Sequence, residues 1–467
     1  MRTYDFENIT IPLYEHIYKC IKEDIINGVF LAGEKLPSKR SFAENNGVST
    51  ITAQNAYEQL ISEGYIFSIP KKGYYVADIR KNNIPENIKK EDISSAIDLP
   101  QNGNNIEIDL SNNFTNPEMF PFSVWSKIMR RLLAEKQESL MTTVDIGGVG
   151  ELRNAIAQHL KSFKGMTVDP RQIIIGAGTE YLYGLLIQLL GNDKTYCIEN
   201  PGYGKLLQIY NLHKVNCCLG NIDNNGIMVE ELIRNNAQIA HISPAHHFPT
   251  GITMSAPRRY EILDWANKAE DRYIIEDDYD SEFRQNGKPI PPMQSMDRNE
   301  KVIYMNTFSK SLTPTIRISY MVLPVHLINE FYKKLGFYNC TVSTFGQYAL
   351  AEFITEGYFE KHINRMRLYY RKKQQEIINI IRNSEIKDRC IIVDNSSGLH
   401  FLLELKTAHK DKYIAEKLME HGISFKALSD YYLDKKERNL HAFLLNYSNI
   451  SSDKVRYALT VIGDVLW

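Results

Sequence analysis

The spacing of apolar residues changes twice along the chain and divides it into three stretches. Between residues 11 and 79, apolar residues recur at helical spacing and are followed by a short hairpin pattern. Residues 80–106 are rich in Asn, Lys, Glu and Ser with little periodicity, so we expect a solvated linker. Over residues 107–467, short β-branched runs alternate with longer amphipathic stretches, which predicts an α/β sheet domain.

The first stretch predicts three helices and a hairpin. Apolar residues spaced four apart from Leu13 to Ile25 predict a helix that ends at Asn27-Gly28. Ser38 and Ser49 are suited to cap the second and third helices, because a serine hydroxyl accepts a hydrogen bond from a free N–H of the first turn. Gly64 ends the third helix. A turn at residues 71–73 then joins two short strands into a wing.

A helix–turn–helix with a wing favours a DNA-binding domain whose third helix enters the major groove. The inward face of that helix is predicted to be Ala53, Ala56, Tyr57 and Leu60. Its outward side carries short hydrogen-bonding side chains, of which Gln54 and Asn55 could meet base edges, while lysines and arginines meet phosphates. The expected DNA contacts are Ser38, Lys39, Arg40, Ser49, Thr50, Thr52, Gln54, Asn55, Lys71 and Lys72.

Charge leaves an alternative open for this stretch. Residues 1–80 hold 9 Lys and Arg against 10 Asp and Glu, which fits a small helical packing domain as well as a DNA reader. The positive charges are nevertheless clustered, at Lys35, Lys39 and Arg40 and again at Lys71 and Lys72. Such clusters suit contacts to phosphates even in a domain that is not basic overall.

Composition bounds the class of protein. The chain has 467 residues, which predicts two or more domains, and a formal net charge of −1, which gives no sign of nucleic acid. No window of about twenty apolar residues exists, so we expect no membrane span. The six cysteines form no C-x-x-C motif, which suits free thiols in a reducing cytoplasm rather than disulfides or a zinc site. No metal site is predicted.

Five predicted strands of the third stretch end in polar or glycine-rich segments. Because ligands of doubly wound sheets bind beyond the carboxyl ends of the strands, these endings predict one shared site. The segments are 176–180, 199–203, 243–251, 276–279 and 306–310.

Lys310 follows a predicted strand and stands beside hydroxyl groups, upstream of Arg317. A lysine amine so placed can form an imine with an aldehyde cofactor, although a surface lysine is the commoner role. Asp277 and Tyr279 are two residues apart at the end of a strand and therefore point to the same side, while Asp278 faces the other way. Asp277 can pair with a pyridinium nitrogen, and Tyr279 can hydrogen-bond the ring oxygen.

Two further features fit a phosphorylated, flat cofactor. Residues 176–180 end a strand and begin a long apolar helix predicted over 181–190, and N–H groups at a helix start can hold a phosphate. Thr307, Ser309 and Arg317 can converge on the same phosphate. Tyr203 follows another strand end, where its ring could stack on the cofactor or lie half-buried in a loop.

The motifs of the first stretch resemble the GntR-type winged helix over about 65 residues. They are Gly33-x-x-Leu-Pro-Ser38-x-Arg40, Gly47-Val-Ser49, Ala56-Tyr57-x-x-Leu60 and Glu63-Gly64-Tyr65. The family often has Arg after the Val-Ser pair, whereas this chain has Thr50. That difference puts the contact from this position in question.

Residues 107–467 resemble the aminotransferase-type, fold-type-I pyridoxal-phosphate domain. The motifs are Asp277-Asp-Tyr279-Asp-Ser-Glu-Phe283, Thr307-Phe-Ser-Lys-Ser-Leu-x-Pro314-x-x-Arg317, Pro201-Gly-Tyr203 and His247-Phe-Pro-Thr-Gly251. The joined arrangement resembles the MocR family of GntR-type regulators over nearly the whole chain.

The resemblance implies a regulator that binds double-stranded operator DNA and carries pyridoxal 5′-phosphate. Lys310 would hold the cofactor as a Schiff base, and Asp277, Tyr279 and Tyr203 would hold its ring. The phosphate would be surrounded by Gly178, Thr179, Glu180, Thr307, Ser309 and Arg317. Family members are usually head-to-tail homodimers, and the effector would be an amino compound or the cofactor itself.

Three functions remain to be weighed: a sensor, a working aminotransferase with an accessory DNA module, and a regulator whose cofactor site is a relic. Aminotransferases of this type usually have Asn where Phe248 stands, and a carboxylate-binding Arg close to residues 443–447, which contain none. Because the bidentate Arg–carboxylate pair is hard to replace, these departures favour the sensor. Lys205, Arg438 or His246 could take that role, although a surface role is the commoner interpretation for each. The retained Lys310, Asp277 and Tyr279 argue against a relic.

Overall fold

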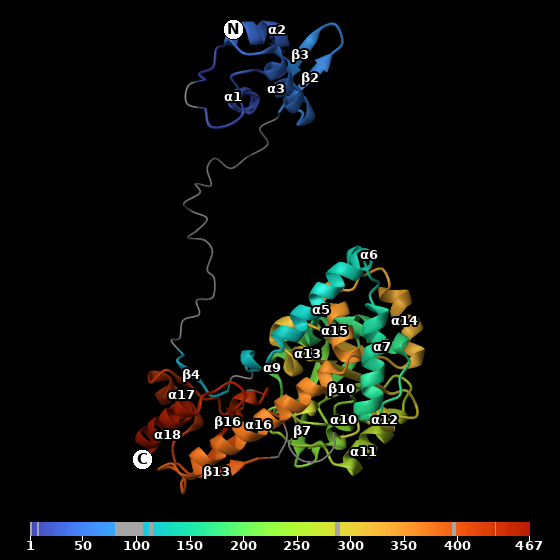
Figure 1. Cartoon of the computed structure of the whole chain (residues 1–467), viewed down its shortest axis with the longest axis vertical. Coiled ribbons are helices and arrows are strands. Elements are labelled where there is room, and N and C mark those ends of the chain that lie inside the picture. The colour runs from blue at the N-terminus through green and yellow to red at the C-terminus, as the bar shows by residue number, and fades with distance from the viewer. Residues whose placement is uncertain are drawn as a thin grey trace. The chain divides into compact units, whose positions relative to one another are not determined.

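The computed structural model describes residues 2–6, 9–79, 106–111, 115–284, 290–394, 398–434 and 436–467. The chain divides into two compact units, Met1–Gly103 and Asn104–Trp467, which are treated separately below (Figure 1). Apart from residue 106, the linker expected over residues 80–106 lies outside the described residues.

The N-terminal unit contains three helices and a small sheet. They are α1 (Leu13–Ile26), α2 (Lys39–Asn46) and α3 (Thr50–Ser62), with β1 (Lys35–Leu36), β2 (Ile66–Ile69) and β3 (Gly73–Val76) in the order β1-β3-β2. The hydroxyl oxygens of Ser38 and Ser49 accept N–H groups of the first turns of α2 and α3 at 3.1 and 3.0 Å. The predicted inward face of α3 is buried. The three helices and the wing expected from the sequence are therefore present.

An eight-stranded sheet forms the centre of the large unit, in the order β5-β12-β11-β10-β9-β6-β7-β8. Its strands are β5 (Ile173–Gly176), β6 (Thr195–Asn200), β7 (Asn216–Asp223), β8 (Gly226–Ile227), β9 (Ile239–Ile242), β10 (Tyr273–Asp278), β11 (Val302–Thr307) and β12 (Ser319–Val322). Strands β8 and β12 are antiparallel to their neighbours, and the other neighbouring pairs are parallel.

Helices cover both faces of this sheet. One face packs against α8 (Thr179–Leu190), α9 (Gly204–Leu212) and α14 (Val325–Leu335), and the other against α10 (Val229–Arg234) and α11 (Ala256–Asn267). Successive strand residues alternate between the faces, so Ile275 joins the first cluster and Ile274 the second. Near β5 and β12 lie further helices. They are α5 (Phe122–Glu135), α6 (Gln137–Met141), α7 (Gly150–His159) and α15 (Thr344–Thr355).

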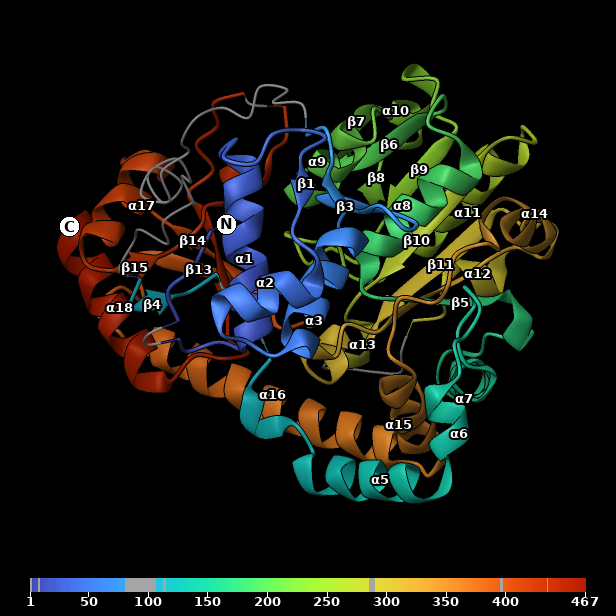
Figure 2. The same ribbon diagram turned by 90° about the horizontal axis from the view of Figure 1, so that it is seen from above.

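The C-terminal part has its own antiparallel sheet, in the order β13-β14-β16, and its own core. The long helix α16 (Tyr358–Arg382) packs on α15 at one point and on α18 at another (Figure 2). The other elements are β13 (Cys390–Val393), β14 (His400–Leu405), α17 (Asp411–Glu420), β15 (Ile423–Ser424, paired with β4, Ile108–Asp109), β16 (Ala442–Asn446) and α18 (Ser452–Leu466).

The topology fixes where a ligand site can form. Strands β5, β6, β9, β10 and β11 all run in one direction, because β12 is antiparallel to both β5 and β11. Their carboxyl ends therefore meet at one edge of the sheet, as the sequence predicted. Among the described residues, no helix is long and apolar enough to cross a membrane.

Candidate functional site

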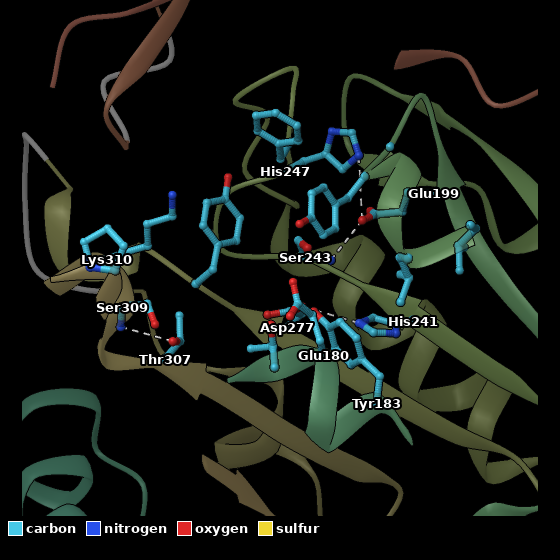
Figure 3. A pocket seen from close by; sticks show the side chains of 18 of the residues that line it. Glu180, Tyr183, Glu199, His241, Ser243, His247, Asp277, Thr307, Ser309 and Lys310 are labelled. Carbon is cyan, nitrogen blue, oxygen red and sulfur yellow. Dashed lines mark hydrogen bonds and ion pairs between the residues drawn. The ribbon is translucent and has the colours of Figure 1, made fainter. Parts of the chain in front are cut away.

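A pocket of about 330 Å³ lies at the carboxyl edge of the large sheet (Figure 3). Residues at or just after the carboxyl ends of five strands line it, including Thr179 after β5, Glu199 on β6, Ser243 after β9, Asp277 on β10 and Thr307 on β11. Lys310 and Thr307 lie on one side, across from Asp277 and His241 (Figure 3). The residues predicted to hold a cofactor that line the pocket are Thr179, Glu180, Tyr203, Asp277, Tyr279, Thr307, Ser309, Lys310 and Arg317.

Asp277 has one carboxylate oxygen engaged and one without a partner. Tyr183 of α8 donates its hydroxyl to Oδ2 of Asp277 at 2.5 Å, and the Nε2 atom of His241 lies 3.5 Å from the same oxygen. Tyr210 of α9 lies 2.7 Å from the other ring nitrogen of His241. The Oδ1 atom of Asp277 is buried and has no hydrogen-bond partner. It is therefore available to a protonated nitrogen of a ligand.

Asp278 faces away from the pocket, as the alternation along β10 predicted. Its Oδ2 atom lies 2.5 Å from Nζ of Lys164 and accepts the hydroxyl groups of Tyr304 and Ser281 at 2.8 and 2.9 Å. This buried network stabilises the end of β10 on the side away from the pocket. Asp278 and Asp277 therefore have different roles, one structural and one directed into the pocket.

The segment between β5 and α8 approaches Arg317 closely. Gly178 has φ of +93°, and a Cβ atom on it would lie 2.3 Å from Nη2 of Arg317, so only glycine fits there. Thr307 accepts the N–H of Ser309 at 3.1 Å, while Oγ of Ser309 is buried without a partner. The free N–H groups of the first turn of α8, the Ser309 hydroxyl and the Arg317 guanidinium together suit a phosphate.

Glu180 lies beside this predicted phosphate site, but the sequence alone did not show what its side chain would contact. Its carboxylate binds Nη2 of Arg317 at 3.0 Å and also pairs with Lys205. The two cations hold the pKa of Glu180 below its usual value, with the hydrogen bond from Lys205 as the largest cause. What Glu180 offers to an anion is thus the N–H of the helix start, not its side chain.

Burial displaces the pKa values of several groups in the pocket, among them Lys310 and Glu199. Burial lowers the pKa of Lys310 to about 8, so about a tenth of its amine is neutral, and hence nucleophilic, at pH 7, far more than for an ordinary lysine. Burial raises the pKa of Glu199 to about 8. Glu199 accepts the N–H of Ser243 at 2.9 Å through one oxygen, while its other oxygen has no partner. The Nε2 atom of His247 lies 3.7 Å from the bonded oxygen.

Two aromatic rings, those of Tyr203 and Phe248, line part of the pocket. Tyr203 is 46% exposed, and its ring centre lies 6.4 Å from that of Phe248, nearly perpendicular to it. Phe248 also contacts the rings of His400 and Tyr431 from the C-terminal part, at 5.7 and 5.2 Å. Phe248 can pack against a flat ligand but cannot donate a hydrogen bond to it.

The ten residues predicted to contact DNA all lie at the surface of the N-terminal unit. The hydroxyl oxygens of Ser38 and Ser49 cap helices, and the amide of Gln54 donates to Glu58 at 2.7 Å. Asn55 is exposed on α3. One exposed residue was missed: Ile51, on the first turn of α3, is 72% exposed. An isoleucine on the polar face of a predicted helix was the signal that could have found it.

Sequence reasoning also missed several residues at the pocket. Tyr183 and His241 contact Asp277, but their positions on an apolar helix and a buried strand resemble ordinary core positions. Asp280 was not assigned to the site, and His246, which binds it, was considered only as a partner for a substrate carboxylate. Asp280 lies directly after Tyr279, and that adjacency was the available signal.

The fold and the pocket define a class: a winged-helix unit together with an α/β unit of the fold-type-I aminotransferase kind. Residues 106–462 match the family of class I and II aminotransferases, and residues 13–76 match the bacterial regulatory proteins of the gntR family. The chain belongs to the MocR-type transcriptional regulators, which join these two domains.

Relatives match over nearly the whole length. The HTH-type transcriptional regulator YhdI of Bacillus subtilis is 36% identical, over 96% of this chain and 94% of the relative. The probable rhizopine catabolism regulatory protein MocR of Rhizobium meliloti is 28% identical, over 96% and 92%. Kynurenine aminotransferase of Pyrococcus horikoshii has a similar fold, with a TM-score of 0.68 and 23% identity over 77% of this chain and 90% of that one.

Proposed function

We propose that this regulator binds pyridoxal 5′-phosphate on Lys310 and uses the loaded pocket to sense an amino compound or the cofactor itself. Binding would change how two winged-helix units of a head-to-tail homodimer hold double-stranded operator DNA. Such a switch requires an effector that binds two arrangements of the protein with different affinity. A DNA-bound regulator of this kind would act in the cytoplasm.

The observation that carries the proposal is the pair of unsatisfied buried atoms that lie in the same pocket as the Lys310 amine. Oδ1 of Asp277 suits a pyridinium nitrogen, and Oγ of Ser309 suits a phosphate oxygen. The close approach of Gly178 to Arg317 supplies the cradle for that phosphate. When bound, the cofactor supplies an aldehyde that reacts with amines and a ring that withdraws electrons. The hydrogen-bond acceptor at Asp277, the donors around the phosphate cradle and the amine of Lys310 suit the ring nitrogen, the phosphate and the aldehyde in turn.

Sensing is favoured over an ordinary amino-acid aminotransferase because each candidate carboxylate-binding group is already engaged. Lys205 is paired with Glu180, and Arg438 binds Asp434 at 2.5 and 2.7 Å. His246 binds Asp280 at 2.8 Å. Residues 443–447 contain no arginine. An α-carboxylate would therefore lack the bidentate partner that such substrates need.

Dimer formation fits exposed apolar side chains on the large unit. Met141 at the end of α6 and Phe337 after α14 are 75% and 76% exposed. Residues 140–144 and several residues between 339 and 344 line one shallow pocket near them. Such exposure suits burial against a second copy of the chain. Sedimentation of the purified protein at micromolar concentration should give twice the mass of the chain.

The test of the proposal is reconstitution followed by titration. Protein incubated with pyridoxal phosphate should turn yellow, and borohydride should fix the cofactor mass to the peptide that contains Lys310. Candidate amines are then titrated while the visible spectrum and the affinity for the promoter fragment are both recorded. A spectral shift without turnover, accompanied by a change in DNA affinity, is expected. A protein that stays colourless after reconstitution overturns the proposal, and steady turnover of an amino-acid/keto-acid pair would instead establish an enzyme.

A further inference from the structure

The side chains of Asp280, His246 and Tyr279 form a row that ends at the pocket. The Nδ1 atom of His246 lies 2.8 and 3.0 Å from the two carboxylate oxygens of Asp280, and 3.1 Å from the hydroxyl of Tyr279. His246 and Asp280 are only 2% and 3% exposed, whereas Tyr279 lines the pocket. The row therefore leads from a buried carboxylate to a hydroxyl at the ligand space.

The protons of this row can be placed from the contacts. Both oxygens of Asp280 face Nδ1, so Nδ1 carries a hydrogen and donates it to the carboxylate. A nitrogen that carries a hydrogen cannot also accept one from Tyr279. The hydroxyl proton of Tyr279 must therefore point elsewhere, and the pocket is the open direction.

The imidazole of His246 has little freedom to turn. A Cβ atom on Gly398 would lie 1.9 Å from Cε1 of His246, so the ring packs directly on that backbone. Tyr447 holds the same backbone by donating to the carbonyl of Gly398 at 2.7 Å, and the His400 ring lies 5.1 Å from that of His246. The Nε2 atom of His246 is buried without a partner, which suits the neutral ring with its one hydrogen on Nδ1.

We propose that Asp280 and His246 are positioning residues that aim the Tyr279 hydroxyl at an anionic oxygen of the ligand. This inference rests on the proposed function, in which that oxygen is the phenolic oxygen of pyridoxal phosphate. The Tyr279 hydroxyl matters more here because Phe248 has no hydrogen-bond donor for the same oxygen. Neither Asp280 nor His246 needs to touch the cofactor.

The Asp280→Asn variant tests the direction of the proton. Because both oxygens of Asp280 face Nδ1, an amide places an N–H group against that nitrogen and favours the tautomer in which Nδ1 is an acceptor. The Tyr279 hydroxyl can then compete with the amide N–H for the single lone pair of Nδ1, so it is no longer directed only at the cofactor. We expect cofactor affinity to fall by about 10- to 100-fold, the usual range for a lost hydrogen bond to a charged group. In Tyr279→Phe the pH midpoint of the visible band should rise by about one unit, because the anionic ring oxygen has lost its donor. In Asp280→Asn it should rise by less, because the lost Asp280 charge also raised the pKa of Lys310.

Two further variants test whether the effect passes through Tyr279. Tyr279→Phe should weaken cofactor binding similarly, and adding Asp280→Asn to it should weaken binding no further, because coupled residues are not additive. His246→Asn keeps an N–H group near the Nδ1 position and should resemble wild type, whereas His246→Leu should resemble Tyr279→Phe. The other ionisable groups around Tyr279 are unchanged in every variant. They are Asp277, Asp278, Glu199, Lys310 and His400.

Asp411→Asn is the matched control, since Asp411 is also 3% exposed and lies 3.7 Å from a histidine, His441, outside the pocket. It should leave cofactor affinity and the visible band unchanged. If wild type binds the cofactor but Asp280→Asn behaves like this control, the positioning role is wrong and the proposed function stands. If Asp280→Asn does not fold, the His246→Asn and His246→Leu pair decides, and equal spectra in those two overturn the inference. A wild type that binds no cofactor refutes the proposed function itself.

Discussion

The Nζ atom of Lys164 lies 2.5 Å from Oδ2 of Asp278, and the two side chains are 1% and 3% exposed. Glu282 lies 3.3 Å from the same ammonium group. This buried pair joins the helical segment Leu160–Lys164, which follows α7, to the end of β10, 114 residues later. The pair stabilises the end of β10, and on the opposite side of this strand Asp277 points into the pocket.

Replacing Lys164 by Met should destabilise the large unit by about 3–5 kcal/mol, because it leaves a buried carboxylate without its partner. Urea unfolding followed by tryptophan fluorescence measures the change, since Trp125, Trp265 and Trp467 all lie in that unit. Lys268→Met is the control, because Lys268 is 67% exposed and pairs with Asp264 on a helix surface. It should cost less than about 1 kcal/mol. Equal effects of the two changes would show that the buried pair contributes nothing.

Lys310 should make the stability of the cofactor-free protein depend on alkaline pH. Its pKa is about 8 in the folded chain against 10.5 unfolded, so between these values the unfolded state binds more protons and stability rises with pH. Lys310→Met removes the buried charge. It should therefore stabilise the protein by about 2–3 kcal/mol at pH 7 and by much less at pH 10.5. Urea unfolding at both pH values checks this, and a pH-independent difference would contradict it.

Glu199 has the opposite dependence. Its pKa rises from 4.5 to about 8 on folding, so the folded state binds the extra proton between these values and stability falls as pH rises through them. Glu199→Gln should be close to wild type at pH 5 and more stable by about 2–4 kcal/mol at pH 9. The hydrogen bond from Ser243 remains available to the amide oxygen. A variant that is less stable at both pH values would rule out a buried, neutral Glu199.

The N-terminal unit was predictable because its signals are local. Ser38 and Ser49 cap the helices that follow them, and the four-residue spacing of isoleucines in α1 reports one buried face. Such information lies within a few residues of the element that it defines.

Strand ends were less predictable, since tertiary contacts decide them. Strands β6, β10 and β11 run two or three residues further than the apolar runs that predicted them. In β10, Asp278 still pairs with Asn306 of β11, and Lys164 neutralises its charge. No local pattern connects a single lysine to an aspartate 114 residues away. The pocket residues that alternate along β10 were found, whereas the supporting Tyr183, which bonds Asp277, was not.

Two kinds of DNA contact are expected from the N-terminal unit, one to phosphates and one to base edges, and different variants should distinguish them. Arg40 is exposed at the start of α2, and Asn55 is exposed on α3. An arginine that contacts phosphate contributes equally to all sequences, whereas an asparagine that contacts a base edge contributes to one. Fluorescence anisotropy with the protein's own promoter fragment and an unrelated duplex distinguishes them.

Arg40→Ala should weaken binding to both duplexes and reduce the salt slope by about one, because one fewer counterion is released. Asn55→Ala should weaken binding to the promoter fragment by about 1–3 kcal/mol and leave the unrelated duplex and the slope unchanged. Lys19→Ala is the control, since Lys19 lies on α1 and pairs with Glu15 at 2.8 Å. It should match wild type in all three quantities. If Arg40→Ala leaves the salt slope unchanged, α2 does not lie along the phosphates and the orientation proposed for α3 in the groove is wrong.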